Sequence, residues 1–156
     1  MVVVADTSPI NYLVLIAQID LLARLYTRIL IPTAVLVELK HPLAPKPVRD
    51  WASNAPSWLE VLSPKGSLTL AQLDLGENEA IALAIEMHAE VVLIDEQAGR
   101  QEAARRGLRV AGTLSVLDEA DQAGLVIFDD AVAALRKTSF RDSQTVLSEI
   151  RQKRSH

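Results

Sequence analysis

Two aspartates follow short apolar runs that have the composition of buried strands. Asp6 comes directly after residues 2–5, and Asp95 comes directly after residues 90–94. The first run is rich in valine and has no polar residue in alternation, which is typical of a strand buried on both faces of a parallel sheet. Because the carboxyl ends of parallel strands meet at one edge of a sheet, we expect the two carboxylates to be neighbours. Carboxylates held close together raise each other's pKa and cost stability, and a divalent cation removes that cost.

Three further acids stand where helices are expected. Glu38 lies in an otherwise apolar stretch within the predicted helix 34–40, and Glu77 and Glu79 fall in the first turn of the predicted helix 76–88. Each acid taken alone also has a structural interpretation: Asp6 and Asp95 as turn or cap residues, Glu38 as a solvated helix residue, Glu77 and Glu79 as partners of the helix dipole. Acids at two strand ends and two helices, with no basic residue beside them, favour an oxygen-liganded Mg²⁺ or Mn²⁺.

Composition limits the other classes of chemistry. The chain has 156 residues, of which 49% are hydrophobic and 23% charged, as expected of a folded single domain. It contains no cysteine and three histidines, which excludes thiolate catalysis and cysteine-ligated metal sites. The uncharged stretch between Asp6 and Asp20 is too short to span a bilayer, and no basic residue precedes it as in a secretory signal. We therefore expect a soluble cytoplasmic protein with no membrane segment.

The charge is unevenly distributed along the chain. The net charge is −4, but residues 136–156 hold six basic and two acidic side chains. An acidic body with a basic tail is compatible with a metal site and a separate binding surface, and equally with a solvated C-terminal helix. We predict a helix at about 142–153 for this basic segment.

The alternation of β-branched runs with helical stretches predicts an α/β protein with a parallel sheet of four or five strands. The chain shows no internal repeat or linker, so we expect residues 1–156 to form one domain. Ser8 and Pro9 have the residue types of a helix cap and first position. The expected strands are 2–5, 28–31, 58–62, 90–94 and 108–111, and the other expected helices are 20–26, 34–40, 48–53, 76–88, 97–106, 113–123 and 142–153.

Several motifs together resemble those of PIN-domain proteins, in a subgroup of largely unassigned prokaryotic members. The resemblance covers residues 2 to 125, and the order and spacing of its motifs carry it. They are Asp6-Thr7-Ser8-Pro9-Ile10, Gly76-Glu77-Asn78-Glu79-Ala80-Ile81-Ala82-Leu83-Ala84, Val92-Leu93-Ile94-Asp95, Gly99-Arg100, Gly107-Leu108 and Gly112-Thr113-Leu114. The resemblance implies a three-layer domain with helices on both faces of the parallel sheet.

The resemblance also implies a function and a set of acids. PIN proteins are usually metal-dependent ribonucleases, and many are toxins of VapBC-type toxin–antitoxin pairs. Asp6 matches the first metal-binding acid, Glu38 the second and Asp95 the fourth. Glu77 matches the third by its spacing to Asp95, with Glu79 as the alternative. The implied activity is hydrolysis of RNA phosphodiester bonds by water activated on Mg²⁺ or Mn²⁺.

Nucleic-acid contacts and partners follow from the same resemblance. Thr7 and Ser8 lie beside the first acid, where a hydroxyl can orient a carboxylate or cap the next helix. Arg100 and Thr113 are expected to contact a phosphate of the RNA, with Arg105, Arg106 and Arg109 as a basic cluster nearby.

The implied partners are a small antitoxin protein and a second copy of the chain. For the homodimer, the residues Ile10, Tyr12, Leu13 and Leu15 are candidates either for the interface or for the core.

Other functions fit the sequence less well. A catalytically weak or inactive PIN-like protein that binds nucleic acid or a partner is the main alternative. A phosphatase of the haloacid-dehalogenase type needs an acid two residues after Asp6, where this chain has Ser8. A receiver-like signalling domain needs a lysine after a late strand, and the segment from Leu108 to Thr113 has none. No glycine-rich phosphate loop follows any expected strand.

Overall fold

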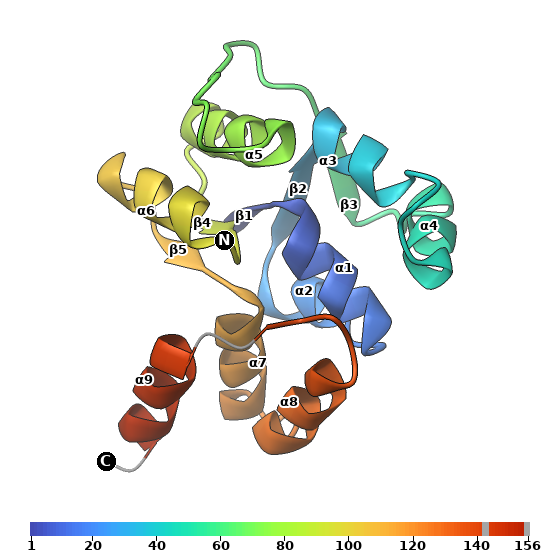
Figure 1. Ribbon diagram of the computed structural model, residues 1–156, viewed down its shortest axis with the longest axis vertical. Coiled ribbons are helices and arrows are strands. Elements are labelled where there is room, and N and C mark those ends of the chain that lie inside the picture. The colour runs from blue at the N-terminus through green and yellow to red at the C-terminus, as the bar shows by residue number, and fades with distance from the viewer. Residues whose placement is uncertain (142–143, 155–156) are drawn as a thin grey trace.

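A computed structural model describes residues 1–141 and 144–154, with residues 144 and 145 described by backbone only. In this part of the chain five parallel strands form one sheet in the order β3-β2-β1-β4-β5 (Figure 1). The strands are β1 (Val2–Ala5), β2 (Arg28–Pro32), β3 (Leu59–Leu62), β4 (Val91–Leu93) and β5 (Val110–Ala111). The parallel α/β architecture predicted from the sequence is confirmed.

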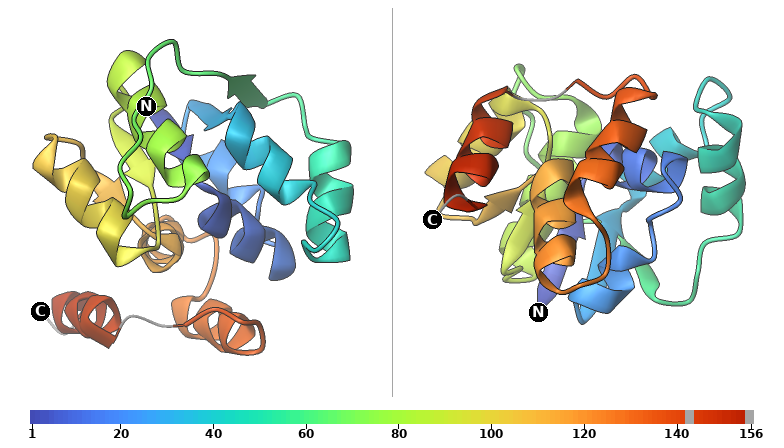
Figure 2. Two further views of the ribbon diagram at one scale, coloured as in Figure 1. Left: turned by 45° about the horizontal axis from the view of Figure 1, so that its top comes forward. Right: turned by 90° about the horizontal axis from the view of Figure 1, so that it is seen from below.

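Helices lie on both faces of this sheet, which makes three layers (Figure 2). They are α1 (Thr7–Leu15), α2 (Leu21–Leu25), α3 (Thr33–Leu39), α4 (Lys46–Ser53), α5 (Leu75–Glu86), α6 (Gln97–Arg105), α7 (Thr113–Gln122), α8 (Phe128–Arg136) and α9 (Gln144–Arg154). Helix α8 was not predicted, although it buries Phe128, Ala131, Val132 and Leu135 at helical spacing. The predicted start of the last helix at Asp142 lies outside the described residues.

The central strand explains the two hydrophobic cores. Val3, Val4 and Ala5 are completely buried. Val3 and Ala5 belong to the core that contains α1, α2, α7 and α8, whereas Val4 belongs to the core beneath α5 and α6. Because side chains alternate along a strand, a strand buried on both faces has to be apolar at every position, as β1 is.

Ile10 and Leu13 of α1 are also completely buried and form part of the first core. The core interpretation of these two residues is therefore confirmed, and they are not available for a homodimer interface. Tyr12 and Leu15 pack against the same core while remaining partly exposed.

The topology brings two strand ends together at the switch point of the sheet. Strands β2 and β3 follow β1 in order on one side of the sheet. The chain then crosses over, and β4 and β5 lie on the other side of β1. Ala5 pairs with Leu93, and the backbone N–H of Asp6 donates to the Leu93 carbonyl at 2.9 Å. In open α/β sheets ligands bind beyond the carboxyl ends of the strands at this crevice.

Candidate metal and nucleic-acid site

Asp6 occupies the N-cap position of α1 but does not use its side chain as a cap. The helix begins at Thr7, so Ser8 lies inside it and is not the cap that the sequence suggested. Asp6 is 3% exposed, and its Oδ1 atom is buried without a hydrogen-bond donor among the described residues. Burial raises the pKa of Asp6 well above its ordinary value, and the charges of Asp74, Glu77 and Glu38 raise it further.

Glu38 approaches Asp6 from α3. The Thr7 hydroxyl donates a hydrogen bond to Glu38 Oε2, so a residue adjacent to the first acid orients the second. Gly76 shows how closely the two acids converge: a Cβ on this glycine would lie 2.9 Å from Glu38 Oε1 and 3.2 Å from Asp6 Oδ1. Two carboxylate oxygens from different elements therefore face the same point beside the first turn of α5.

Glu77 is held at the start of α5 by reciprocal hydrogen bonds with Asp74. The Glu77 N–H donates to Asp74 Oδ1 at 2.8 Å, and the Asp74 N–H donates to Glu77 Oε1 at 3.1 Å. This capping box leaves Glu77 Oε2 buried without a donor in the described part of the chain. Burial and the negative charges of Asp74 and Glu96 raise the pKa of Glu77 to about 7.

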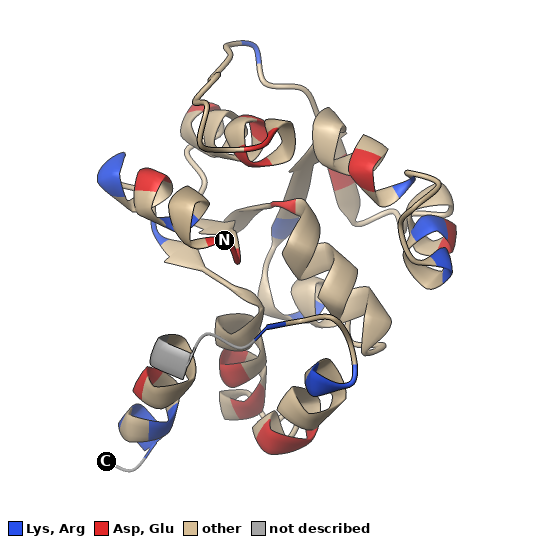
Figure 3. Cartoon of the chain, viewed as in Figure 1, with Lys and Arg blue, Asp and Glu red and all other residues tan. Residues whose placement is uncertain are grey.

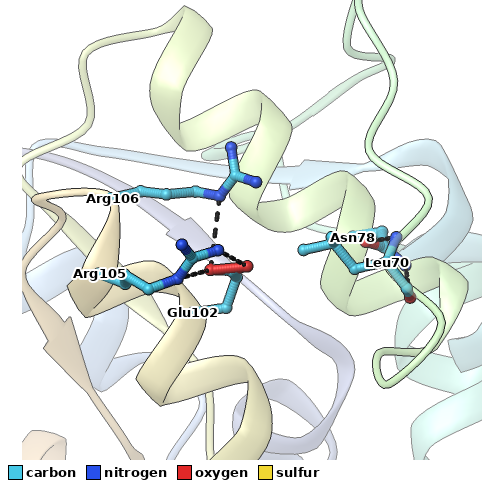
Figure 4. A network of polar contacts seen from close by, with 5 residues as sticks. All are labelled: Leu70, Asn78, Glu102, Arg105 and Arg106. Atoms are coloured by element: carbon cyan, nitrogen blue, oxygen red, sulfur yellow. Dashed lines mark hydrogen bonds and ion pairs between the residues drawn. The ribbon is translucent and has the colours of Figure 1, made fainter.

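Asp74 and Asn78 are site residues that sequence analysis missed. The charge of Asp74 acts on both Asp6 and Glu77. The Asn78 amide donates to the carbonyls of Leu70, Leu73 and Asp74, which fixes the loop leading to the cap, and Figure 4 shows its link to Leu70. The spacing Asp74-x-x-Glu77 is a capping-box signal that sequence analysis could have used.

Glu79, the alternative third acid, has a different partner. Its Oε2 atom accepts a hydrogen bond from the backbone N–H of Ala34 at 3.2 Å. Ala34 is the second residue of α3, so Glu79 satisfies one of the free N–H groups at the start of that helix. This contact joins α5 to α3, while Glu77 Oε2 remains free; the geometry therefore favours Glu77 over Glu79 as a ligand.

Asp95 follows β4 and is oriented by Thr113. The Thr113 N–H donates to Asp95 Oδ1 at 2.7 Å, and the Thr113 hydroxyl donates to Asp95 Oδ2 at 2.8 Å. Burial raises the pKa of Asp95, while the Thr113 hydrogen bonds and the charge of Arg100 oppose that rise. Thr113 is completely buried, so the expected contact of its side chain with a phosphate is wrong. It positions the fourth acid instead.

The basic cluster expected beside these acids is partly neutralised. Glu102, which is buried, pairs with Arg105 at 2.6 Å and with Arg106 at 3.7 Å (Figure 4). Arg100 does not take part in these ion pairs with Glu102. It lines a cavity of about 640 Å³ together with Asp95 and Gln97. Arg100 is therefore placed beside the fourth acid, and its expected contact with a phosphate stays a prediction.

These residues supply carboxylate oxygens, which are the ligands of an oxygen-liganded cation. Acidic segments at the start of α1, on α3, at the start of α5 and after β4 surround one region (Figure 3). Two of these carboxylates have a buried oxygen without a donor, which is costly for the charged form unless a cation or a proton neutralises it. Within the described residues no three acids or histidines are already gathered around one point. Mg²⁺ binds through one or two carboxylates with several waters, which suits the pair Asp6 and Glu38.

The chain is an α/β protein with a five-stranded parallel sheet and two acids, Asp6 and Asp95, after the neighbouring strands β1 and β4. Residues 2–156 match the family DUF3368, described as a PIN domain, and the chain belongs to this family. PIN domains are generally metal-dependent nucleases.

Among solved structures, the chain is similar to a PilT N-terminus domain protein from the hyperthermophilic archaeon Sulfolobus solfataricus P2. The identity is 14%, the match covers 92% of this chain and 100% of that one, and the TM-score is 0.48. A search of curated proteins gives no match. In the described part of the chain no helix is long and apolar enough to cross a membrane.

Proposed function

We propose that this chain is a Mg²⁺- or Mn²⁺-dependent endoribonuclease of the PIN type that acts in the cytoplasm as the toxin of a VapBC-like pair. The observation that carries the proposal is the convergence of Asp6 Oδ1 and Glu38 Oε1 on one point beside Gly76, with the aspartate oxygen buried and without a donor. A bound cation would stabilise both carboxylates in their charged form, which burial and mutual repulsion otherwise disfavour.

The chain supplies binding and orientation to the reaction. Asp6 and Glu38 would hold the cation, with Thr7 orienting Glu38 and with Glu77 Oε2 as a further ligand. A divalent cation in this position stabilises charge on the phosphate and lowers the pKa of water. Two hydrogen bonds from Thr113 hold Asp95, and Arg100 beside it would supply the positive charge that positions a phosphate of the RNA.

The partners of the proposed toxin follow from the same acids. An antitoxin that covers Asp6 and Glu38 would place a basic side chain among their carboxylate oxygens, in the position of the cation. Two large apolar side chains flank these acids and are mostly exposed, Val37 at 62% and Leu75 at 65%. Exposed apolar residues around a charged centre are typical of a protein interface. We also propose that the chain forms a homodimer, for which analytical ultracentrifugation is the direct test.

A second candidate is a PIN-like protein that binds nucleic acid or a partner with weak or no cleavage. Both oxygens of Asp95 accept hydrogen bonds from Thr113, and Glu77 is committed through Oε1 to its capping box. These contacts reduce the number of carboxylate oxygens left for metal ions, and this observation favours the second candidate.

The experiment that separates the two candidates uses calorimetric Mn²⁺ titration and RNA cleavage on the same samples of wild type, Asp6→Asn and Asp50→Asn. Asp50 is an exposed acid on α4 that pairs with Lys46, and it is the matched control for loss of one charge. The ribonuclease proposal expects Asp6→Asn alone to lose both Mn²⁺ binding and cleavage. Mn²⁺ binding without cleavage by the wild type supports the binding protein, and normal cleavage by folded Asp6→Asn refutes the assignment.

A further inference from the structure

A glycine on α6 lies directly against the third acid. A Cβ on Gly99 would lie 2.7 Å from Glu77 Oε2 and 3.5 Å from Glu77 Cδ. Carbon and oxygen atoms that are not bonded usually stay roughly 3.3–3.6 Å apart, so any other residue at position 99 would collide with this carboxylate. Gly112 stands in the same relation to Asp95, with 2.7 Å between the position of its Cβ and Asp95 Oδ1. Two hydrogen bonds from Thr113 already hold Asp95, whereas Glu77 Oε2 has no donor among the described residues, so Gly99 is the residue that bounds this oxygen.

The backbone of α6 does not require glycine at this position. Gly99 is the third residue of the helix Gln97–Arg105. It does not have the left-handed φ of Gly107 and Gly124. Within a helix alanine is favoured over glycine, because glycine loses more conformational freedom on folding. The space beside the backbone, which Glu77 occupies, is therefore the reason for glycine that the structure offers.

Glu77 cannot turn away from Gly99 without losing a second interaction. It is 5% exposed and lies between α5 and α6, which are neighbours on one face of the sheet (Figures 1 and 2). The Asp74 N–H donates to Glu77 Oε1, and this bond is one half of the capping box that begins α5. With Oε1 held at the start of α5, Oε2 points toward α6, where Gly99 leaves room for it. A side chain at position 99 would therefore displace the carboxylate or open the capping box.

We propose that Gly99 is a positioning residue for the third acid: because it has no side chain, the Glu77 carboxylate can lie between α5 and α6 with Oε2 free to bind the cation. This inference rests on the proposed function, in which Glu77 Oε2 is a further ligand. The same space sets the length of the residue at position 77. Glutamate reaches Gly99, whereas aspartate is one methylene shorter and would leave room for a methyl group at position 99.

The test is a double-mutant cycle of Gly99→Ala and Glu77→Asp in the full-length protein, with Gly66→Ala as the control. Gly66 also faces a carboxylate oxygen, Glu86 Oε1, but its Cβ would lie 3.9 Å from it, which is ordinary contact. Urea unfolding is measured without metal, and Mn²⁺ affinity is measured by calorimetry. The methyl group of Gly99→Ala would also meet Ile94 Cγ2 at 2.9 Å, but this contact is the same in both backgrounds and cancels in the cycle.

Without metal, we expect Gly99→Ala to lower the urea midpoint of the otherwise wild-type protein, and to lower it less when Glu77→Asp is present. With Mn²⁺, Gly99→Ala should raise the Kd about tenfold or more when Glu77 is retained, because the displaced oxygen no longer reaches the cation. It should change the Kd less than about twofold in the Glu77→Asp background, as expected of residues that do not interact. Gly66→Ala should leave the Kd unchanged.

Equal midpoint losses for Gly99→Ala in the two backgrounds would overturn the proposal, because the methyl group would then meet Ile94 alone. If Gly99→Ala does not fold, recovery of folding by the added Glu77→Asp supports the proposal, and no recovery overturns it. An unchanged Mn²⁺ Kd in folded Gly99→Ala would also overturn it, since the glycine would then not position a ligand. A wild type that binds no Mn²⁺ and cleaves no RNA refutes the proposed function instead, and the metal-free midpoints still decide whether Gly99 places Glu77.

Discussion

Gly76→Ala tests whether the convergence of Asp6 and Glu38 is the metal site. The new methyl group would lie 2.9 Å from Glu38 Oε1, 3.1 Å from Glu38 Oε2 and 3.2 Å from Asp6 Oδ1, closer than the roughly 3.3–3.6 Å usual for carbon against oxygen. At least one carboxylate has to move away. Because Mg²⁺ requires oxygen ligands at about 2.0–2.1 Å in near-octahedral geometry, such a displacement is expected to weaken binding at least tenfold.

The fold should tolerate the same substitution. Gly76 lies in the first turn of α5 with ordinary helical backbone, where alanine is favoured over glycine by about 0.5–1 kcal/mol. Crowding of the carboxylates costs about 1–3 kcal/mol and offsets that gain. The free energy of unfolding without metal should therefore stay within about 2 kcal/mol of the wild-type value. Gly66→Ala is the matched control, since its Cβ would meet no atom closer than 3.9 Å.

The assay is thermal or urea unfolding with and without Mn²⁺, combined with calorimetric titration. At a Mn²⁺ concentration 100 times the wild-type Kd, ligand binding stabilises the wild type by about 2.7 kcal/mol. A variant with tenfold weaker binding gains only about 1.4 kcal/mol under the same conditions. Gly66→Ala should behave as wild type. Folded Gly76→Ala with wild-type Mn²⁺ affinity would show that these two carboxylates do not hold the cation.

Three further predictions concern the other acids. Because burial raises the pKa of Glu77 to about 7 from an ordinary 4.5, the metal-free protein should lose stability as the pH rises from about 4.5 to 7, where the unfolded chain is ionised and the folded carboxyl still holds its proton. Glu77→Gln should reduce this slope in urea titrations without abolishing it, because the raised pKa values of Asp6 and Asp95 contribute a slope of the same sign. Glu79→Gln should keep the Mn²⁺ affinity but lower the free energy of unfolding by about 1 kcal/mol, because the hydrogen bond from the Ala34 N–H is weakened. An equal decrease of Mn²⁺ affinity in Glu79→Gln and Glu77→Gln would contradict our choice of third acid. Thr113→Val should lower the cleavage rate or the metal affinity about 10- to 100-fold, because Asp95 loses the hydrogen bond from the Thr113 hydroxyl. An unchanged cleavage rate and metal affinity in a folded variant would show that Thr113 does not position Asp95.

The sequence alone was sufficient to determine the architecture around the site. A strand buried on both faces is continuously apolar, and an acid directly after such a strand lies at the carboxyl edge of a parallel sheet. These two local patterns were enough to place Asp6 and Asp95 at neighbouring strand ends. Local signals also gave Gly107 as the end of α6, and this glycine has a left-handed φ of +83°.

Only the tertiary structure decided which side chain meets which. Glu77 and Glu79 lie two residues apart on one helix turn, so sequence spacing hardly separates them. The packing of α5 against α3 brings Glu79 to the Ala34 N–H and leaves an oxygen of Glu77 free. In the same way Thr113 was expected to contact a phosphate, but the pairing of β4 with β5 places it against Asp95. Such contacts join residues far apart in the chain, and their distances depend on how helices pack on the sheet, which no local pattern encodes.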